Sequence, residues 1–221
     1  GEDTISHGNV QSLINSSYPK LTNDQEVLHV IPRIYDTDGL KSVRNPVGLH
    51  AKHVEVEAHV VLGDSPAVKN VLKAVKKSGI SVRSLVLSPL AAAEACLTED
   101  EREMGVVLVD IGGGTTDIAV LNEGALWYTA ILPVGGNQLT RDLSVALGVP
   151  FYFAEETKTR WGHALPEVVD SSQEVILPTF QGREPRAVSR KEVCNPLYER
   201  LNETIKLVLL KLRGAGMRAL P

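Results

Sequence analysis

A glycine-rich segment at Gly105–Val120, GVVLVDIGGGTTDIAV, constrains the fold of this chain more than any other stretch. Two short runs of mostly β-branched apolar residues flank three consecutive glycines, and this pattern predicts a strand, a tight turn and a second strand. Glycine lets the backbone approach a ligand closely, and successive N–H groups in such a turn point toward one anion. The segment therefore predicts a phosphate-binding turn between two strands.

A dinucleotide fingerprint does not fit these glycines. That motif requires G-x-G-x-x-G at the start of a helix, whereas here no third spaced glycine follows and strand-forming residues come after the turn. A glycine-rich hairpin without a ligand stays open as the structural alternative on these residues alone.

Asp110 stands where the first strand meets the glycines. A carboxylate beside a polyphosphate is repelled unless a cation lies between them, so Asp110 is predicted to hold Mg²⁺, mainly through water. The backbone N–H groups of Gly112, Gly113, Gly114 and Thr115 are predicted to bind β- and γ-phosphate oxygens.

Two other sets of polar residues invite functional interpretations. Glu155 and Lys158 lie three residues apart on a predicted helix and face the same side. On spacing alone, the favoured interpretation is a surface ion pair that contributes roughly a few tenths of a kcal/mol. His53 and His59 share a strand face but lie about 20 Å apart, so a zinc site is not predicted.

Composition excludes several classes of function. The net charge of −4 gives no reason to expect a nucleic-acid partner. No run of about 18 apolar residues is present to span a membrane, and the polar start lacks the apolar region of a signal peptide. Cys96 and Cys194 stand alone, which suggests neither a disulfide framework nor a metal site and fits a reducing cytosol.

Hydrophobic periodicity along the chain predicts a mixed α/β protein. Residues 1–25 are polar and are expected to form a loop or the remnant of a preceding element. Ser65 and Ser88 each precede a proline and are expected to be helix N-caps. The other predicted strands are 26–35, 54–62, 80–87, 125–132, 174–177 and 186–189, and the predicted helices are 66–77, 90–97, a helix from 139, 154–161 and 189–213, with a glycine- and proline-containing loop around 182–185.

Several segments together resemble the FtsA family of bacterial cell-division proteins. The matching segments are EVLHVIPRIY, NPVGL, VEVEAHVVLG, VLSPLAAAEA, VDIGGGTTDIAV, LPVGGN and AEETKTRWG, in that order. DIGGGTTD is shared with MreB and DnaK-type chaperones, whereas HVIP and NPVGL followed by VEAH are more specific. The resemblance implies an actin-like (ribonuclease-H-like) ATPase fold with an FtsA-type 1C subdomain of mixed α+β character.

The resemblance also implies a division of the chain into parts. The parts are 1–25 as a polar remnant or loop, 26–88 as a 1C-like subdomain, 89–103 as a helix returning to subdomain 1A, 104–148 as a 2A core with the second phosphate loop, 149–193 as a 2B-like subdomain, and 194–221 as a long helix returning to 2A.

In function, the resemblance implies a cytoplasmic protein that binds ATP with Mg²⁺, polymerises, and links the FtsZ ring to the inner face of the cell membrane. Gly135, Gly136 and Asn137 would line the nucleotide cleft, and Glu155 and Lys158 would reach the ribose and adenine. Self-association would use the 1C-like part, and the FtsZ C-terminal peptide would bind the 2B-like part.

Three expected features of the family have no counterpart in this sequence: a first phosphate loop, a second adenosine motif and a C-terminal amphipathic membrane anchor. The chain is therefore expected to be a fragment with half a nucleotide site, with little or no ATP binding alone and weak ATPase activity at most. Two alternatives stay open, a PilM-type pilus-assembly protein and an ATP-hydrolysing enzyme on the same fold.

Overall fold

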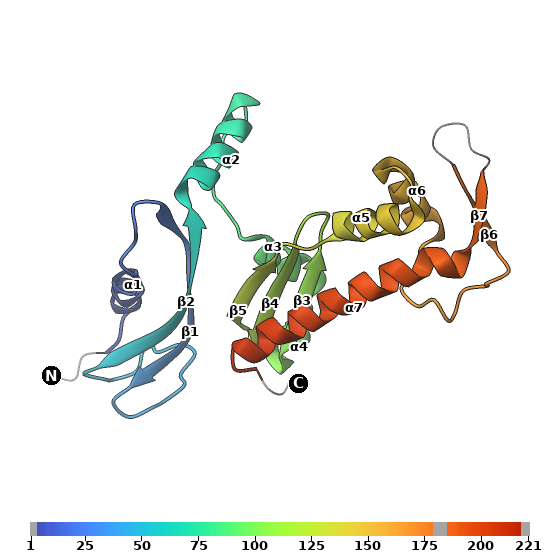
Figure 1. Cartoon of the computed structure of the whole chain (residues 1–221). Helices are drawn as coiled ribbons and strands as arrows, with labels where there is room; N and C mark the ends of the chain where they lie inside the picture. The colour runs from blue at the N-terminus through green and yellow to red at the C-terminus, as the bar shows by residue number, and fades with distance from the viewer. Residues whose placement is uncertain (1–3, 179–184, 218–221) are drawn as a thin grey trace. The chain divides into compact units, whose positions relative to one another are not determined.

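The computed structural model describes residues 4–178 and 185–217. The chain forms two compact units: the first holds Ala119–Thr129 and the described residues up to Leu108, and the second holds Val109–Ile118 and the described residues from Ala130 onward. The elements in chain order are α1 (His7–Ser16), β1 (Gln25–Thr37), β2 (Val54–Asp64), α2 (Ser65–Lys77), α3 (Ser88–Cys96), α4 (Glu99–Met104), β3 (Val106–Ile111), β4 (Thr116–Asn122), β5 (Ala125–Leu132), α5 (Gly136–Leu147), α6 (Phe151–Trp161), β6 (Glu174–Leu177), β7 (Arg186–Ser189) and α7 (Arg190–Gly214), as labelled in Figure 1. The mixed α/β class predicted from periodicity is confirmed.

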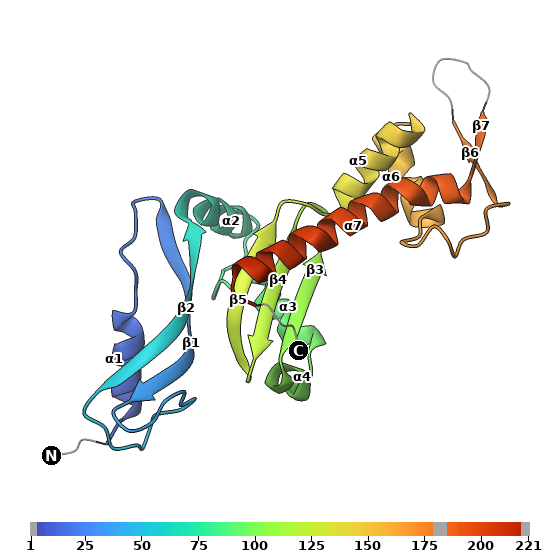
Figure 2. The same cartoon turned by 60° about the horizontal axis from the view of Figure 1, so that its bottom comes forward.

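The first unit begins with helix α1 and the long antiparallel hairpin β1–β2, which lie side by side in Figures 1 and 2. The hairpin has two register irregularities, one of them just after Pro32, a residue that has no N–H to donate to a ladder. Of the two expectations for residues 1–25, a loop or the remnant of a preceding element, the loop is wrong for His7–Ser16, which is helical. Ser6 and Asn9 form a capping box there, and three apolar side chains at helical spacing are half-buried (Val10, Leu13 and Ile14).

The predicted N-caps of two helices are wrong by one residue. Asp64, not Ser65, caps α2, because its carboxylate accepts the Ala67 N–H at 2.9 Å. Helix α3 starts at Ser88, and its N-cap, Leu87, makes no side-chain cap bond. In both cases proline marks the first turn correctly, but several neighbouring residues can supply the cap.

The strand expected over 80–87 is not formed. β-branched composition favours an extended backbone, but a strand also needs a neighbouring edge to pair with, and none pairs here among the described residues. Instead, the Leu87 N–H is donated to Nε2 of His29 at 3.1 Å. The acidic residues that follow α3 lie in the short helix α4, where Thr98 and Glu101 make a capping box.

Strands β3, β4 and β5 form a three-stranded sheet in that order, which confirms the strand–turn–strand prediction and the third strand. The central strand β4 is the most buried of the three. Within the first unit, Ala119, Leu121 and Leu126 from this sheet pack with Ala93 of α3.

The second unit contains helices α5, α6 and α7 and the antiparallel hairpin β6–β7 (Figure 1). The two short strands form as predicted, and the predicted loop at 182–185 lies almost wholly outside the described residues. An apolar cluster of buried residues joins the helices and the hairpin of the second unit: Leu143, Leu147, Val149, Ala154, Val175, Leu177, Val188, Val193 and Leu197.

Helix α7, predicted over 189–213, has one mainly apolar buried face. Leu197, Val208 and Leu212 are buried, but Ile205 is 55% exposed and the neighbouring Thr204 is buried. One residue corresponds to about 100° of helix rotation, so these two adjacent side chains point to different sides of the helix.

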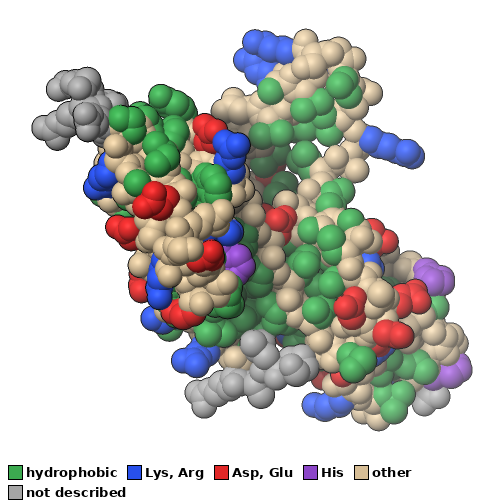
Figure 3. Space-filling model, turned by 90° about the vertical axis from the view of Figure 1, so that its right-hand side faces the viewer, with side chains coloured by type: hydrophobic (Ala, Val, Ile, Leu, Met, Phe, Trp, Pro, Cys, Tyr) green, Lys and Arg blue, Asp and Glu red, His purple; other side chains and the backbone are tan. Residues whose placement is uncertain are grey.

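No helix in the described part of the chain is both long and apolar enough to cross a membrane. On the face drawn in Figure 3, acidic and basic side chains are interspersed with apolar ones, without a continuous basic surface among the described residues.

Candidate functional site

The glycine turn in the second unit is closed by its own backbone. The Gly112 N–H is donated to the Thr115 carbonyl at 2.9 Å. Thr116, the first residue of β4, is fully buried and donates its hydroxyl to the Val134 carbonyl at 2.7 Å. This second bond ties the start of β4 to the segment that leads into α5.

The turn also caps helix α5. The carbonyls of Gly112 and Gly113 accept the N–H groups of Gly136 at 2.9 Å and Asn137 at 2.7 Å. These bonds satisfy two of the N–H groups that a helix start leaves without partners, where the N-cap, Gly135, has no side chain to do so. The predicted residues 112–115 and 135–137 are therefore brought together in the structure.

The direction of these carbonyls fixes the direction of the next N–H groups. In a trans peptide the C=O of one residue and the N–H of the following residue point in opposite directions. Because the Gly112 and Gly113 carbonyls point at α5, the N–H groups of Gly113 and Gly114 both point away from it. A Cβ added at Gly114 would meet nothing within 4 Å, so there is open space beside this residue. Two neighbouring donors that both point away from α5 are suited to bind an anion.

Close packing explains why a glycine precedes α5. A Cβ at Gly135 would lie 2.5 Å from the Gly112 oxygen and 2.8 Å from the Gly113 oxygen. Asn137 has its side chain against the turn as well, because a Cβ at Gly113 would lie 3.8 Å from its Nδ2. The predicted Gly135–Asn137 segment thus forms the wall behind the turn.

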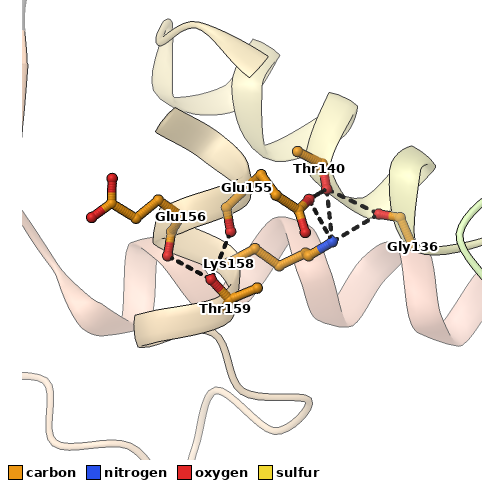
Figure 4. Close-up of polar contacts among 6 residues, drawn as sticks. All are labelled: Gly136, Thr140, Glu155, Glu156, Lys158 and Thr159. Atoms are coloured by element: carbon orange, nitrogen blue, oxygen red, sulfur yellow. Dashed lines mark hydrogen bonds and ion pairs between the residues drawn. The ribbon is translucent and has the colours of Figure 1, made fainter. Parts of the chain in front are cut away.

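Glu155 and Lys158 form a network with α5, not the surface ion pair that spacing alone favours. The Lys158 Nζ, on a side chain only 19% exposed, donates to Glu155 Oε2 at 2.7 Å, to Thr140 Oγ1 at 2.8 Å and to the Gly136 carbonyl at 3.2 Å (Figure 4). The ammonium has three donors, so these contacts use all of them. Lys158 therefore connects α6 to the first turn of α5.

Glu155 is held as a carboxylate. Hydrogen bonds first from Lys158 and then from Thr140 hold the pKa of Glu155 below its ordinary value of 4.5, and burial opposes them. The Glu155 side chain remains 42% exposed. It can therefore still accept a hydrogen bond from a ligand hydroxyl, whereas the Lys158 ammonium already has its full set of acceptors.

Asp110 lies exposed at the end of β3, directly before the turn. Among the described residues, no group of three or more His, Cys, Asp or Glu could hold a metal ion. A single carboxylate fits Mg²⁺ better than a metal enclosed by protein, because Mg²⁺ keeps several waters and binds through one or two carboxylates plus phosphate oxygens.

Thr140 is the residue of this site that the sequence did not reveal. It is fully buried, and its hydroxyl contacts Lys158, Glu155 and the Gly136 carbonyl. A signal does exist in the sequence: Thr140 lies at helical spacing with Leu143 and Leu147, so a hydroxyl falls on the apolar face of α5. A buried hydroxyl needs a hydrogen-bond partner, and here that partner comes from another helix.

Comparison with solved structures defines the class of fold. A chain of the PilM–PilN type IV pilus biogenesis complex superposes with a TM-score of 0.60 at 16% identity, covering 97% of this chain and 52% of that chain. MreB5 of Spiroplasma citri, solved with AMPPNP, gives a TM-score of 0.51 at 22% identity over 71% of this chain and 52% of that chain. The chain therefore has the actin-like ATPase fold, as the resemblance implied.

Sequence comparison defines the family. The family model described as "Cell division protein FtsA" matches residues 107–221, and "SHS2 domain inserted in FTSA" matches residues 1–62. FtsA of Pseudomonas aeruginosa is 40% identical over 193 residues (87% of this chain, 46% of the relative), and FtsA of Escherichia coli K12 is 38% identical over 225 residues (98% and 54%). The chain belongs to the FtsA family, and it spans about half the length of the curated relatives it matches.

Proposed function

We propose that the turn and the α5–α6 network are the phosphate side and the ribose side of an ATP site in an FtsA-type cell-division protein. The observation that carries this proposal is the hydrogen bonding between the turn and α5, which directs the N–H groups of Gly113 and Gly114 outward together. The network of Glu155 and Lys158 supports it, because it starts from the same helix terminus. MreB5, which shares the fold, was solved with AMPPNP and with ADP.

Each residue of the site has a distinct role in this proposal. The N–H groups of Gly113, Gly114 and Thr115 bind β- and γ-phosphate oxygens, while Gly112 uses its N–H to close the turn. Asp110 holds Mg²⁺ through water, and the ion neutralises phosphate charge. In the wall behind the turn, Gly135, Gly136 and Asn137 line the cleft. On α6, Glu155 accepts a hydrogen bond from a ribose hydroxyl, and Lys158 orients the Glu155 carboxylate.

In the cell, the proposed function is that of an adaptor. The protein self-assembles, binds the FtsZ C-terminal peptide and links the FtsZ ring to the cytoplasmic membrane, with weak ATPase activity at most. Family membership supports this function. We further propose subdomain boundaries at 26–88, 89–103, 104–148, 149–193 and 194–221, with self-association through 26–88 and the FtsZ peptide on 149–193.

Calorimetric titration with Mg-ATP tests the nucleotide site. The experiment uses the whole gene product that carries this chain, and in parallel the 221-residue chain. We expect saturable binding by the former and little or none by the latter. Absence of binding to the whole product would refute the proposal, and micromolar binding by the chain alone would refute the expectation that it holds half a site.

Peptide pull-downs test the adaptor function. The whole gene product is incubated with an immobilised FtsZ C-terminal peptide and, as the matched alternative, with a pilus-system peptide. Retention by the FtsZ peptide alone is expected, and retention by the pilus peptide alone would favour the PilM-type alternative, whose structural support is the similarity in fold. Phosphate release far above a weak ATPase rate would instead favour an ATP-hydrolysing enzyme.

A further inference from the structure

Thr140 lies at the centre of the contacts between α5 and α6. Its side chain is fully buried, and its Oγ1 accepts from Lys158 Nζ at 2.8 Å. The same oxygen lies 3.0 Å from the Gly136 carbonyl oxygen and in hydrogen-bond contact with Glu155 Oε2 (Figure 4). One hydroxyl therefore contacts both members of the ion pair and the helix backbone.

The Thr140 hydroxyl has one proton and two possible acceptors, the Gly136 carbonyl and Glu155 Oε2. It can donate to only one of them at a time. A carboxylate is the stronger acceptor, because a hydrogen bond to an ionised group is about twice as strong as one between neutral groups. The Gly136 carbonyl keeps a donor in any case, since Lys158 Nζ lies 3.2 Å away. The arrangement that satisfies every group has Thr140 donating to Glu155.

Glu155 Oε2 then receives two hydrogen bonds from two different helices, from Thr140 of α5 and from Lys158 of α6. Two bonds to one oxygen hold a rotatable carboxylate in a single orientation. The other oxygen of this half-exposed side chain is left to accept from a ligand. Fixing an acceptor before the ligand arrives reduces the entropy that binding must overcome.

We infer that Thr140 is a positioning residue that orients Glu155 toward a ribose hydroxyl and so sets the preference for ribonucleotides over deoxyribonucleotides. The inference rests on the proposed function, because it names the sugar-reading part of the same site. A site built to accept from a hydroxyl discriminates strongly against a ligand that lacks it. Thr140 itself does not touch the ligand.

The first test needs no nucleotide. The Glu155 carboxyl is titrated by carbon-13 NMR in the wild type and in Thr140→Val, which keeps the β-branched shape and removes the hydroxyl. Because the hydroxyl lowers the pKa of Glu155, the valine variant is expected to raise that pKa, and Thr140→Ser to leave it low. An unchanged pKa in the valine variant would overturn the inference.

Thr204→Val is the matched control for both tests. Thr204 is also a buried helix threonine, and its hydroxyl donates to the carbonyl four residues earlier, that of Arg200, at 2.9 Å. Thr140 likewise lies within hydrogen-bond distance of the carbonyl four residues earlier, that of Gly136, but it also contacts Glu155. A change seen in both valine variants would report general damage and would count against a specific role for Thr140.

The second test measures sugar discrimination in the whole gene product. Affinities for ATP, 2′-deoxy-ATP and 3′-deoxy-ATP are compared, and the wild type is expected to favour ATP over at least one analogue by about tenfold. Thr140→Val should reduce that ratio of affinities to about threefold or less. In a protein that already carries Glu155→Ala, adding Thr140→Val should not reduce the ratio further. Equal weakening of all three nucleotides would show a merely structural role and overturn the inference. Failure of the wild type to bind any nucleotide would refute the proposed function instead. The NMR titration of Glu155 would still decide whether Thr140 donates a hydrogen bond to Glu155.

Discussion

Replacing Gly135 with alanine tests whether the turn and α5 are held together as described. The backbone of Gly135 is extended, with φ −160° and ψ −162°, so any residue can adopt its conformation and the cost is purely steric. The new Cβ would meet three backbone atoms: the Gly112 oxygen at 2.5 Å, the Gly113 oxygen at 2.8 Å and the Gly113 carbonyl carbon at 2.9 Å. Backbone atoms cannot rotate away, so the turn itself must move from the helix.

That movement weakens the two hydrogen bonds by which the turn caps α5. Each contributes about 0.5–1.5 kcal/mol net, and overpacking of a well-packed site adds about 1–3 kcal/mol. The variant is therefore expected to lose about 2–6 kcal/mol of the free energy of unfolding. Urea denaturation followed by circular dichroism measures the loss, and an unchanged slope with denaturant would indicate that only stability changed.

Gly114→Ala is the control for this experiment, because a Cβ there meets nothing within 4 Å. The free energy of unfolding of this variant is expected to fall by no more than about 0.5 kcal/mol, as for an ordinary surface substitution. If the two alanine variants had the same stability, the close approach of the turn to α5 would be refuted.

Three further predictions concern the core, the acid range and the metal. Leu143→Ala, at a fully buried position of the second-unit core, should cost about 2–5 kcal/mol in urea denaturation, whereas Val145→Ala, 78% exposed, should be nearly neutral. The folded-state pKa of Glu155 is lowered, so its stabilisation is complete above the ordinary value of 4.5 and is lost as pH falls through the folded-state pKa; stability measured against pH should fall less steeply there in Glu155→Gln. Asp110→Asn should remove most of the Mg²⁺ dependence of ATP affinity in calorimetry with and without the ion, and an unchanged dependence would contradict the proposed role of Asp110.

Local pattern was sufficient to predict the glycine turn and its strands. Strand-forming residues on both sides and glycines between them leave little choice of local structure, and the β3–turn–β4 arrangement is confirmed. The hairpin strands β6 and β7 are equally local. The segment at 80–87 has a similar composition but no strand partner in the part of the chain that the structure describes, because pairing depends on a neighbouring edge that its own sequence does not encode.

The site itself was only half visible in the sequence, for the same reason. Spacing placed Glu155 and Lys158 on one side of a helix, but it could not show that this side faces α5. The third member of the network comes from 15 residues earlier in the chain, where Thr140 donates to Glu155. Contacts between helices depend on packing of the unit, so the pair that spacing assigned to the surface is part of a partly buried network between α5 and α6.

Gly136 connects the two halves of the proposed site through a single residue. Its N–H is donated to the Gly112 carbonyl of the turn, and its own carbonyl accepts from Lys158 Nζ. One series of hydrogen bonds therefore runs from the turn through the Gly136 backbone to Lys158 on α6. Alanine would fit at Gly136 without a clash, since its Cβ would lie 3.6 Å from Lys158 Nζ and 3.7 Å from the Gly112 oxygen. This connection thus depends on the hydrogen bonds of the Gly136 backbone and not on the absence of its side chain, whereas at Gly135, one residue earlier, the absence of a side chain is what lets the turn approach.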